Sequence, residues 1–267
     1  MIRWSLVGLL ALVCLPGIAV ALPRATRLIR ERLAGLPDSR KVPPLSVLVA
    51  GQSIQALLVT TALAVGGSAA APHTGLGAPF FDALLTGHSA MSEFQAQILP
   101  ALALGIGGAL IFLVAYYLIF RPRLDIETLR AMESVRKRAG PWGRLLYGGI
   151  VEETMCRFGC MNLLVWAVYA AAGRSSWGLW LGIVLSGLLF GLGHIPTYRQ
   201  AGCTGSPWFY ATEIVLNLWA ACIFGWLFAT YGLLAAMIAH AAFHVVWYPF
   251  DRLFAEKVPT EPEEATT

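Results

Sequence analysis

The stretch VEETMCRF at residues 151–158 decides what kind of protein this chain forms. It places Glu152, Glu153 and Arg157 inside an apolar run that extends from about residue 145 to residue 173. A charged side chain at the centre of a bilayer costs on the order of a few kcal/mol or more, so such residues usually face a protein interior or a water-filled cavity. The stretch therefore predicts a membrane helix whose polar side chains face the inside of a bundle.

The composition of the whole chain agrees with a membrane protein. Of its 267 residues, 57% are hydrophobic and 13% are charged, whereas soluble domains average about 25% charged residues. A helix needs about 20 apolar residues to cross a bilayer. We therefore predict an all-α polytopic bundle of about seven transmembrane helices, with a polar catalytic cavity in the cytoplasmic half. The expected spans are roughly 4–22, 45–66, 98–120, 145–172, 177–195, 208–229 and 232–250.

The basic residues predict the orientation of the bundle. Sixteen of the nineteen Lys and Arg residues lie in segments expected on one side, two lie on the other, and Arg157 lies within a span. Because basic loops stay in the cytoplasm, we expect the N-terminus outside and the C-terminus in the cytoplasm. The compact loops suggest a bacterial plasma membrane. The first span could instead be a cleaved signal, but cleavage would leave four arginines outside, so we favour a retained helix. The net charge of +4 follows from this topology and indicates no nucleic-acid partner.

The chain divides into three parts by composition and motifs. Residues 1–144 contain N-terminal spans and loops without a motif, residues 145–250 form the predicted catalytic core, and residues 251–267 form an acidic cytoplasmic tail. Within the first part, residues 121–140 are charged and suggest an amphipathic surface helix that ends at Gly140 and Pro141.

The three charged residues of the central stretch have different expected roles. Glu153 and Arg157 are spaced i, i+4, which places them on one face of an α-helix in the order that favours an ion pair. Glu152 would point about 100° away. One carboxylate can then neutralise the arginine while the other stays available. From these residues alone, catalysis, the pinning of helices and a transport path all remain open.

Later spans contribute further polar groups. His194 follows a glycine-containing segment, and His240 and His244 are again spaced i, i+4. That spacing suits two ligands of one metal, two hydrogen-bond donors to an oxyanion, or purely structural hydrogen bonds. Glu213 and Asn217, one turn apart on the sixth span, could line the same cavity or could bond to each other or to the backbone, and we favour the bonds.

The predicted topology brings the ionisable groups together. Counted from the span ends, Glu152, His194, His240 and His244 all fall in the cytoplasmic half of the membrane. A glutamate and a histidine that converge can hold and deprotonate a water molecule, with the carboxylate as general base. Further histidines can stabilise a tetrahedral oxyanion. The pattern thus favours hydrolysis of a peptide bond within the membrane.

The same motifs resemble those of the CPBP family, the CAAX-protease and bacteriocin-processing membrane enzymes that are also called the ABI family. The resemblance covers residues 145–248 and rests on the order of three motifs on successive spans. These are Glu152-Glu153-x-x-x-Arg157, Phe190-x-x-x-His194 and His240-x-x-x-His244.

The resemblance implies roles for these residues. Glu152 and His194 would activate the water, Glu153 and Arg157 would organise the site, and His240 would help to form the oxyanion hole. The substrate would be a membrane-embedded or prenylated protein or peptide that is reached from the lipid bilayer.

The chain departs from the family pattern at one position. His244 stands where asparagine is commonest, and a neutral histidine still donates one N–H to an oxyanion. The histidine also completes a Glu/His/His/His set that could bind zinc, formed by Glu152, His194, His240 and His244. The family has been described both as metalloproteases and as metal-independent glutamate proteases, and the sequence leaves this choice open.

Two other functions stay open at this stage. Buried Glu, Arg and His residues also occur along the ion pathways of proton- or ion-coupled transporters, although no pair of broken-helix repeats is present in the sequence. The replacement of asparagine by His244 also permits a catalytically silent membrane scaffold. Dependence on an ion gradient would identify the transporter, and insensitivity to Glu152→Gln would identify the scaffold.

Overall fold

The computed structural model describes residues 1–34 and 42–255, and all regular elements in this part are helices, which confirms the predicted fold class. Residues 256–267 of the predicted acidic tail lie outside the described residues. The α-helices are α1 (Trp4–Ala34), α2 (Leu45–Thr74), α3 (Pro79–Thr86), α4 (Ala90–Ala115), α5 (Ile126–Gly143), α6 (Asn162–Ala172), α7 (Ser176–Gln200), α8 (Pro207–Tyr231) and α9 (Leu233–Ala255). Between them lie the π-helices η2 (Tyr116–Phe120), η4 (Arg144–Glu152) and η5 (Thr154–Met161) and the 3₁₀-helix η3 (Arg121–Arg123).

Seven helical segments in the described part of the chain are long and apolar enough to cross a membrane, as predicted. Several extend beyond the predicted bounds. The helix that begins at Trp4 continues to Ala34 past Arg24 and Arg27, because a helix can leave the hydrocarbon layer and continue in the aqueous layer without a break. Hydropathy reports the width of the apolar layer, and hydrogen bonding sets the length of the helix.

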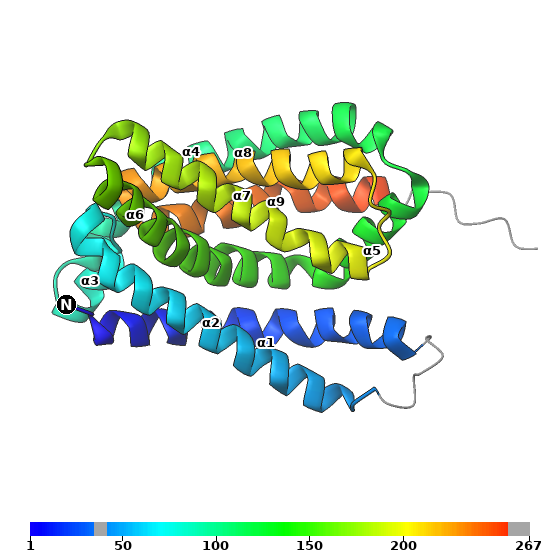
Figure 1. Cartoon of the computed structure of the whole chain (residues 1–267), viewed down its shortest axis with the longest axis horizontal. Coiled ribbons are helices and arrows are strands. Elements are labelled where there is room, and N and C mark those ends of the chain that lie inside the picture. The colour runs from blue at the N-terminus through cyan, green and yellow to red at the C-terminus, as the bar shows by residue number, and fades with distance from the viewer. Residues whose placement is uncertain (35–41, 256–267) are drawn as a thin grey trace, which may run out of the picture.

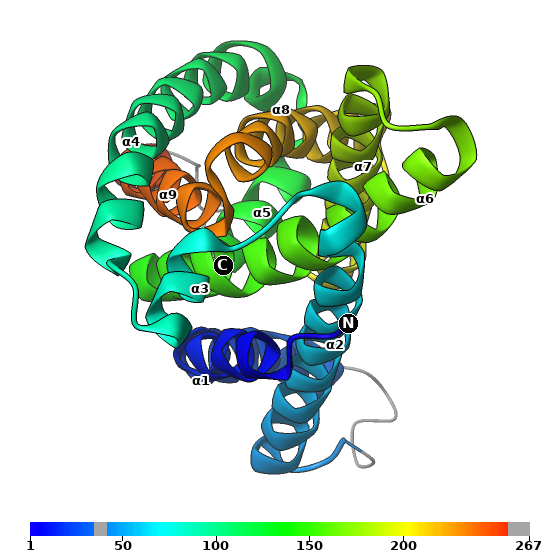
Figure 2. The ribbon, with the colours of Figure 1, turned by 90° about the vertical axis from the view of Figure 1, so that its left-hand side faces the viewer.

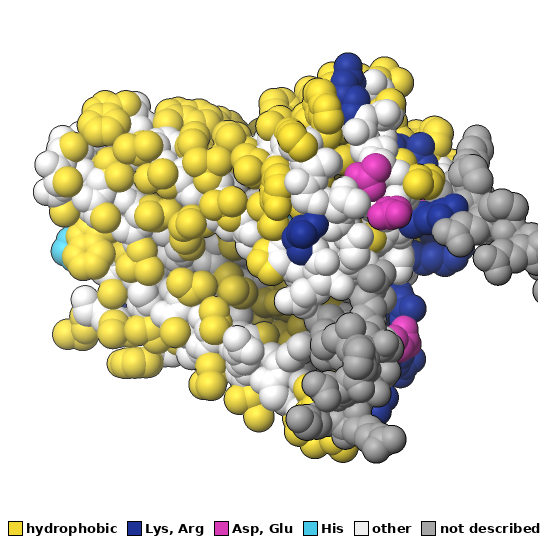
Figure 3. Space-filling view, turned by 45° about the vertical axis from the view of Figure 1, so that its right-hand side comes forward, with side chains coloured by type: hydrophobic (Ala, Val, Ile, Leu, Met, Phe, Trp, Pro, Cys, Tyr) yellow, Lys and Arg dark blue, Asp and Glu magenta, His cyan; other side chains and the backbone are white. Residues whose placement is uncertain are grey.

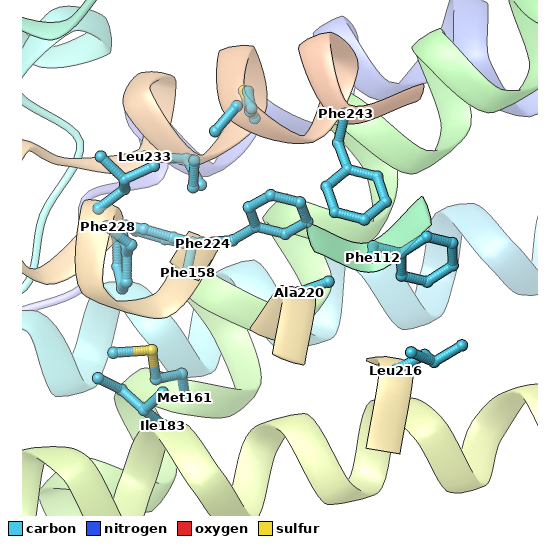
Figure 4. Packing of buried hydrophobic residues seen from close by; sticks show 14 of the residues in the cluster. Phe112, Phe158, Met161, Ile183, Leu216, Ala220, Phe224, Phe228, Leu233 and Phe243 are labelled. Atoms are coloured by element: carbon cyan, nitrogen blue, oxygen red, sulfur yellow. The ribbon is translucent and has the colours of Figure 1, made fainter. Parts of the chain in front are cut away.

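The helices form two unequal groups. α1 and α2 pack against each other along one side of the molecule, and the remaining helices form the larger group (Figures 1 and 2). Within that group α4 packs on α9 and α7 packs on α8. Aromatic side chains fill the space between these helices (Figure 4), with the ring of Phe243 centred 5.0 Å from that of Phe112 and 5.9 Å from that of Phe224.

A kink separates the charged helix from the central membrane helix. Gly140 has φ 65° and ψ 178°, a conformation that glycine adopts without the steric penalty other residues pay. Pro141 follows, where its fixed φ suits the first position of a new helix. The predicted end of the charged segment at these two residues is confirmed, and the helix that restarts there carries residues 144–172 without interruption.

The outer surface shows the expected division into apolar and basic zones. Hydrophobic side chains cover most of the face in Figure 3, and the Lys and Arg side chains visible there lie toward the end that holds α5 and the C-terminal part of α9 (Figures 1 and 3). The same view shows a hollow between the α1–α2 layer and the other helices. An apolar belt with one basic end is the surface that a bilayer requires.

Close approach of α4 to α9 depends on Gly105. A Cβ atom at this position would lie 2.8 Å from the Cα atom of Ala239, whereas a Cβ at Gly107, half a turn away on the same helix, meets nothing within 4 Å. Small residues allow helices in membranes to approach closely.

We therefore expect Gly105→Ala to lower the free energy of unfolding by about 1–3 kcal/mol through overpacking. The matched variant Gly107→Ala should be neutral or slightly stabilising, since alanine is the better helix former. Thermal unfolding of both purified variants in the same detergent measures the difference. Equal stability of the two variants would contradict the packing argument.

Candidate active site

The helix segment that carries the central stretch is π-helical. η4 ends at Glu152, η5 begins at Thr154, and Glu153 lies between them. π-Helical hydrogen bonds run from i to i+5 and occur frequently at functional sites. Because a π turn contains more residues than an α turn, successive side chains diverge less, and both glutamates face His240. The angle of about 100° expected between the two glutamates is that of an α-helix, and Glu153 itself keeps α-helical dihedral angles, φ −69° and ψ −37°, between the two π-helical segments.

Glu153 joins two other buried groups. Its Oε2 atom accepts a hydrogen bond of 3.2 Å from Arg157 Nε, and its Oε1 atom lies 2.7 Å from His240 Nδ1. The side chains of Glu153 and Arg157 are both inaccessible to solvent. The predicted i, i+4 ion pair is confirmed, and the carboxylate in addition ties the central helix to α9.

Glu152 has a different environment from its neighbour. Its side chain is 21% exposed, and its Oε2 atom lies 4.0 Å from His240 Nε2. That distance is too long for a hydrogen bond. One carboxylate is therefore committed to the arginine and the other stands at the edge of a cavity, which is the division that the sequence predicted.

The two histidines of α9 contact each other. Their Nε2 atoms are 3.1 Å apart, and the ring of His240 stacks on Phe224 at 4.6 Å. A carboxylate only accepts hydrogen bonds, so His240 Nδ1 carries the hydrogen that points to Glu153. In the neutral ring His240 Nε2 is then an acceptor, and His244 Nε2 donates to it. The N–H group on the cavity side of this pair thus belongs to His244.

His194 is fixed by a bond within its own helix. Its Nδ1 atom lies 2.8 Å from the carbonyl oxygen of Phe190, which assigns the hydrogen to Nδ1 and leaves Nε2 as the acceptor of the neutral ring. The ring of Phe190 meets that of His194 edge-on at 4.5 Å, and the guanidinium carbon of Arg157 lies 5.8 Å from the Phe190 ring centroid. Phe190 therefore separates the buried cation from the histidine.

A single cavity brings these groups together. It has a volume of about 630 Å³ and is bounded by α1, α2, α4, α5, α7, α8 and α9 together with η2 and the central helix. Four of the six predicted site residues line it, namely Glu152, His194, His240 and His244. Glu153 and Arg157 do not line the cavity, so they can act only through the residues that do.

The glycine at position 148 shapes the cavity next to the histidines. A Cβ atom there would lie 3.0 Å from His244 Nε2 and 3.2 Å from His240 Nε2. A side chain at this position would therefore press on both imidazoles. The sequence shows the glycine but not which side chains it accommodates.

Glu213 and Asn217 bond to each other, as expected. Asn217 Nδ2 donates to the carbonyl oxygen of Glu213 at 2.7 Å and to its Oε2 atom at 3.4 Å. Both residues also line the cavity, so the two expectations for them are compatible.

Sequence reasoning missed a second polar group at the cavity. Arg136 and Arg144 line it and both bond to the buried carboxylate of Asp251. In the sequence the two arginines serve only as markers of topology, because both lie outside the predicted spans. Arg136 lies on α5 and Arg144 at the start of the central helix, and both pair with Asp251 on α9. No local sequence pattern predicts these pairs, because their members are more than 100 positions apart.

The predicted zinc ligands are the four residues that line the cavity, Glu152, His194, His240 and His244. In residues 1–34 and 42–255, no three His, Cys, Asp or Glu side chains converge so that they could hold a metal ion. The contact between the Nε2 atoms of His240 and His244 engages the two atoms that would have to turn toward an ion. The residues do not fit a zinc site in this arrangement, and zinc dependence stays a prediction.

Comparison with protein families matches residues 141–246 to the family described as Type II CAAX prenyl endopeptidase Rce1-like. The matched range contains all six predicted site residues and confirms the resemblance to the CPBP, or CAAX-protease, family. Comparisons with curated proteins and with solved structures give no match to the chain.

The two adjacent glutamates should respond differently to the same substitution. Glu153→Gln removes the charge that compensates the fully buried Arg157, and leaving a buried charge unpaired costs about 3–5 kcal/mol. Glu152→Gln affects a partly exposed side chain without a hydrogen bond, so the free energy of unfolding should change by less than about 0.5 kcal/mol.

Thermal unfolding of the two purified variants beside the wild type measures this difference. The substitutions are chemically identical and adjacent in sequence, so each serves as the control for the other. A loss of stability of the same size in both variants would show that Glu153 is not the compensating group.

Proposed function

We propose, from the CAAX-protease family match over residues 141–246, that this chain is an intramembrane endopeptidase that hydrolyses a peptide bond with a water activated by Glu152 and His194. The observation that carries the proposal is the division of labour between the two glutamates. Glu153 is bonded to Arg157 and His240, and Glu152 lines the cavity with a partly exposed carboxylate.

The first step is the activation of water. In this mechanism the carboxylate of Glu152 accepts a proton from the water, and Nε2 of His194 accepts a hydrogen bond that orients it. The water oxygen forms a bond to the scissile carbonyl carbon, and the carbonyl oxygen becomes the oxyanion. When the C–N bond breaks, the proton held by Glu152 passes to the leaving amine.

The oxyanion is stabilised by the histidines of α9. His244 Nε2 carries the hydrogen that now points to His240, and a small rotation would present it to the oxyanion. Glu153 holds the His240 ring through Nδ1. Arg157 forms the ion pair that fixes the carboxylate of Glu153 in this position. These last two residues are positioning residues, because the cavity does not reach them.

The test compares protein termini in membranes from cells that make the wild type or Glu152→Gln at equal levels. We expect new termini only with the wild type, since loss of a general base lowers the rate about 10²–10⁴-fold. His194→Ala should also abolish them. Glu213→Gln is the matched control, because it alters another cavity glutamate that can keep its bond to Asn217.

Two results would count against the proposal. Proteolysis that continues in Glu152→Gln would remove the proposed base. If neither the wild type nor the variant produces new termini, and both are folded, the assignment would move to an ion-coupled transporter or a scaffold. A measurement of ion-gradient dependence in proteoliposomes would then separate those two functions.

Chelation distinguishes direct activation of the water by Glu152 from activation by a bound zinc ion. We expect activity to survive treatment with 1,10-phenanthroline, because in the proposed mechanism Glu152 activates the water directly. Loss of activity that is restored by Zn²⁺ would instead assign zinc to Glu152, His194, His240 and His244. The readout is cleavage by the purified protein before and after the treatment.

We also propose that the chain lies in a bacterial plasma membrane with the cavity open toward the cytoplasm. The proposal is supported by Arg136, Arg138 and Arg144, which line the cavity and belong to the basic segments expected in the cytoplasm. A tag at the C-terminus should be accessible to protease only after spheroplasts are opened. Accessibility in intact spheroplasts would reverse the orientation.

A further inference from the structure

The three histidines at the cavity differ in how their rings are held. His240 Nδ1 lies 2.7 Å from Glu153 Oε1. His194 Nδ1 lies 2.8 Å from the carbonyl oxygen of Phe190. His244 has no such bond, since its Nδ1 atom is buried without a hydrogen-bond partner among the described residues. A hydrogen bond at one ring nitrogen normally fixes the orientation and tautomer that the other nitrogen presents. The His244 ring must therefore be oriented in another way.

Aromatic stacking takes the place of the missing hydrogen bond. Trp247 follows His244 by three positions on α9, which places both residues on one face of the helix. Their rings are nearly parallel, with 13° between the planes and 5.9 Å between the centroids. Aromatic pairs attract each other at centroid distances of about 4.5–7 Å. Rotation of the imidazole about its Cβ–Cγ bond would tilt it away from the indole, so the stack opposes that rotation.

The indole of Trp247 is itself held by three other parts of the bundle. The ring of Phe112 on α4 lies 4.6 Å away between centroids. The guanidinium carbons of Arg136 on α5 and Arg144 on the central helix each lie 5.5 Å from the indole, within the range of a cation–π interaction. Both guanidinium groups are bonded in turn to Asp251. Trp247 therefore offers the imidazole a surface with little freedom to move.

We infer that Trp247 is a positioning residue for the proposed reaction, and that it fixes the plane of the His244 ring so that the N–H group of Nε2 meets the oxyanion. For its effect on the rate, the inference rests on the proposed peptidase function. Trp247 also lines the cavity, so a direct contact with the substrate is the competing role.

The stack leaves one useful movement to the imidazole. Its Nε2 atom lies 3.1 Å from that of His240, and it also borders the space that the absent side chain of Gly148 leaves at the cavity. A small rotation within the plane of the ring keeps the contact with Trp247 and can turn the N–H group from His240 toward that space. A preorganised donor of this kind needs little rearrangement when the negative charge develops.

The first experiment observes the His244 ring without turnover. The chain has five histidines, so full-length protein in detergent with isotope-labelled histidine gives few ring-nitrogen NMR signals, and those absent from His244→Ala belong to His244. At alkaline pH, where imidazoles are neutral, the wild type should show one His244 tautomer with the hydrogen on Nε2. In Trp247→Leu the two His244 nitrogens should move toward a common average. His194 should stay unchanged and His240 should keep its hydrogen on Nδ1.

The second experiment uses the substrate that the comparison of termini identifies. Trp247→Leu should lower kcat about 3- to 10-fold, the effect of losing one aromatic pair, and should change KM by less than about twofold. Trp247→Phe keeps a ring and should recover most of kcat and the wild-type spectrum. Trp219→Leu is the matched control. Trp219 also joins its helix to α4, through a bond of 3.1 Å to the carbonyl oxygen of Gly108, but it does not line the cavity, so both constants should be unchanged.

A double-mutant comparison separates positioning from a general effect on the fold. In protein that carries His244→Ala, the addition of Trp247→Leu should lower kcat no further, because the residue through which Trp247 acts is missing. If Trp247→Leu does not fold, Trp247→Met replaces it in all measurements, since methionine adapts to irregular gaps.

Three results would overturn the inference. An unchanged His244 spectrum in Trp247→Leu would show that the stack does not orient the ring. A rise in KM with kcat unchanged would assign Trp247 to substrate binding. An equal loss of kcat with and without the His244 side chain would assign Trp247 a purely structural role.

The spectra separate this inference from the proposed function. If Trp247→Leu releases the His244 ring and the wild type cleaves no substrate, the positioning of His244 stands and the peptidase function fails. If the wild type cleaves its substrate and Trp247→Leu leaves the ring in place, the peptidase function stands and the inference fails.

Discussion

The interaction on which the rest of the structure depends is the burial of Arg157 against Glu153. A guanidinium removed from both water and lipid must be neutralised by a partner whose position is fixed. Glu153 provides that partner from one turn earlier in the same helix and uses its other oxygen to hold His240 on α9. One carboxylate thus compensates a charge, orients an imidazole and joins two helices, and this commitment is what leaves the adjacent Glu152 available for chemistry.

The local geometry of the central helix makes this arrangement possible. An α-helix would direct adjacent glutamates to separate faces, but the π-helical segments η4 and η5 bring both toward α9. Gly148 keeps the space beside the two α9 histidines open.

Charge is distributed through the cavity in two groups. In the first group, Glu152 and three histidines line a region suited to proton transfer. Glu153, which is paired with Arg157, contacts this group through His240. Nearer the basic end, Arg136 and Arg144 share the carboxylate of Asp251.

The sequence alone determined the class of fold, the seven membrane segments, the break at Gly140 and the ion pair of Glu153 with Arg157. These depend on composition, on local backbone preferences and on spacing within one helix, all of which are short-range properties. It also identified the six candidate residues, because ionisable groups in apolar segments are rare and therefore conspicuous. Only the tertiary structure decided that Glu153 holds His240, that both glutamates turn toward α9 and that Arg144 meets Asp251. Those contacts join helices far apart in the chain or depend on π-helical turns, and neither the relative placement of helices nor the choice of a π over an α turn is encoded in a local pattern of residues.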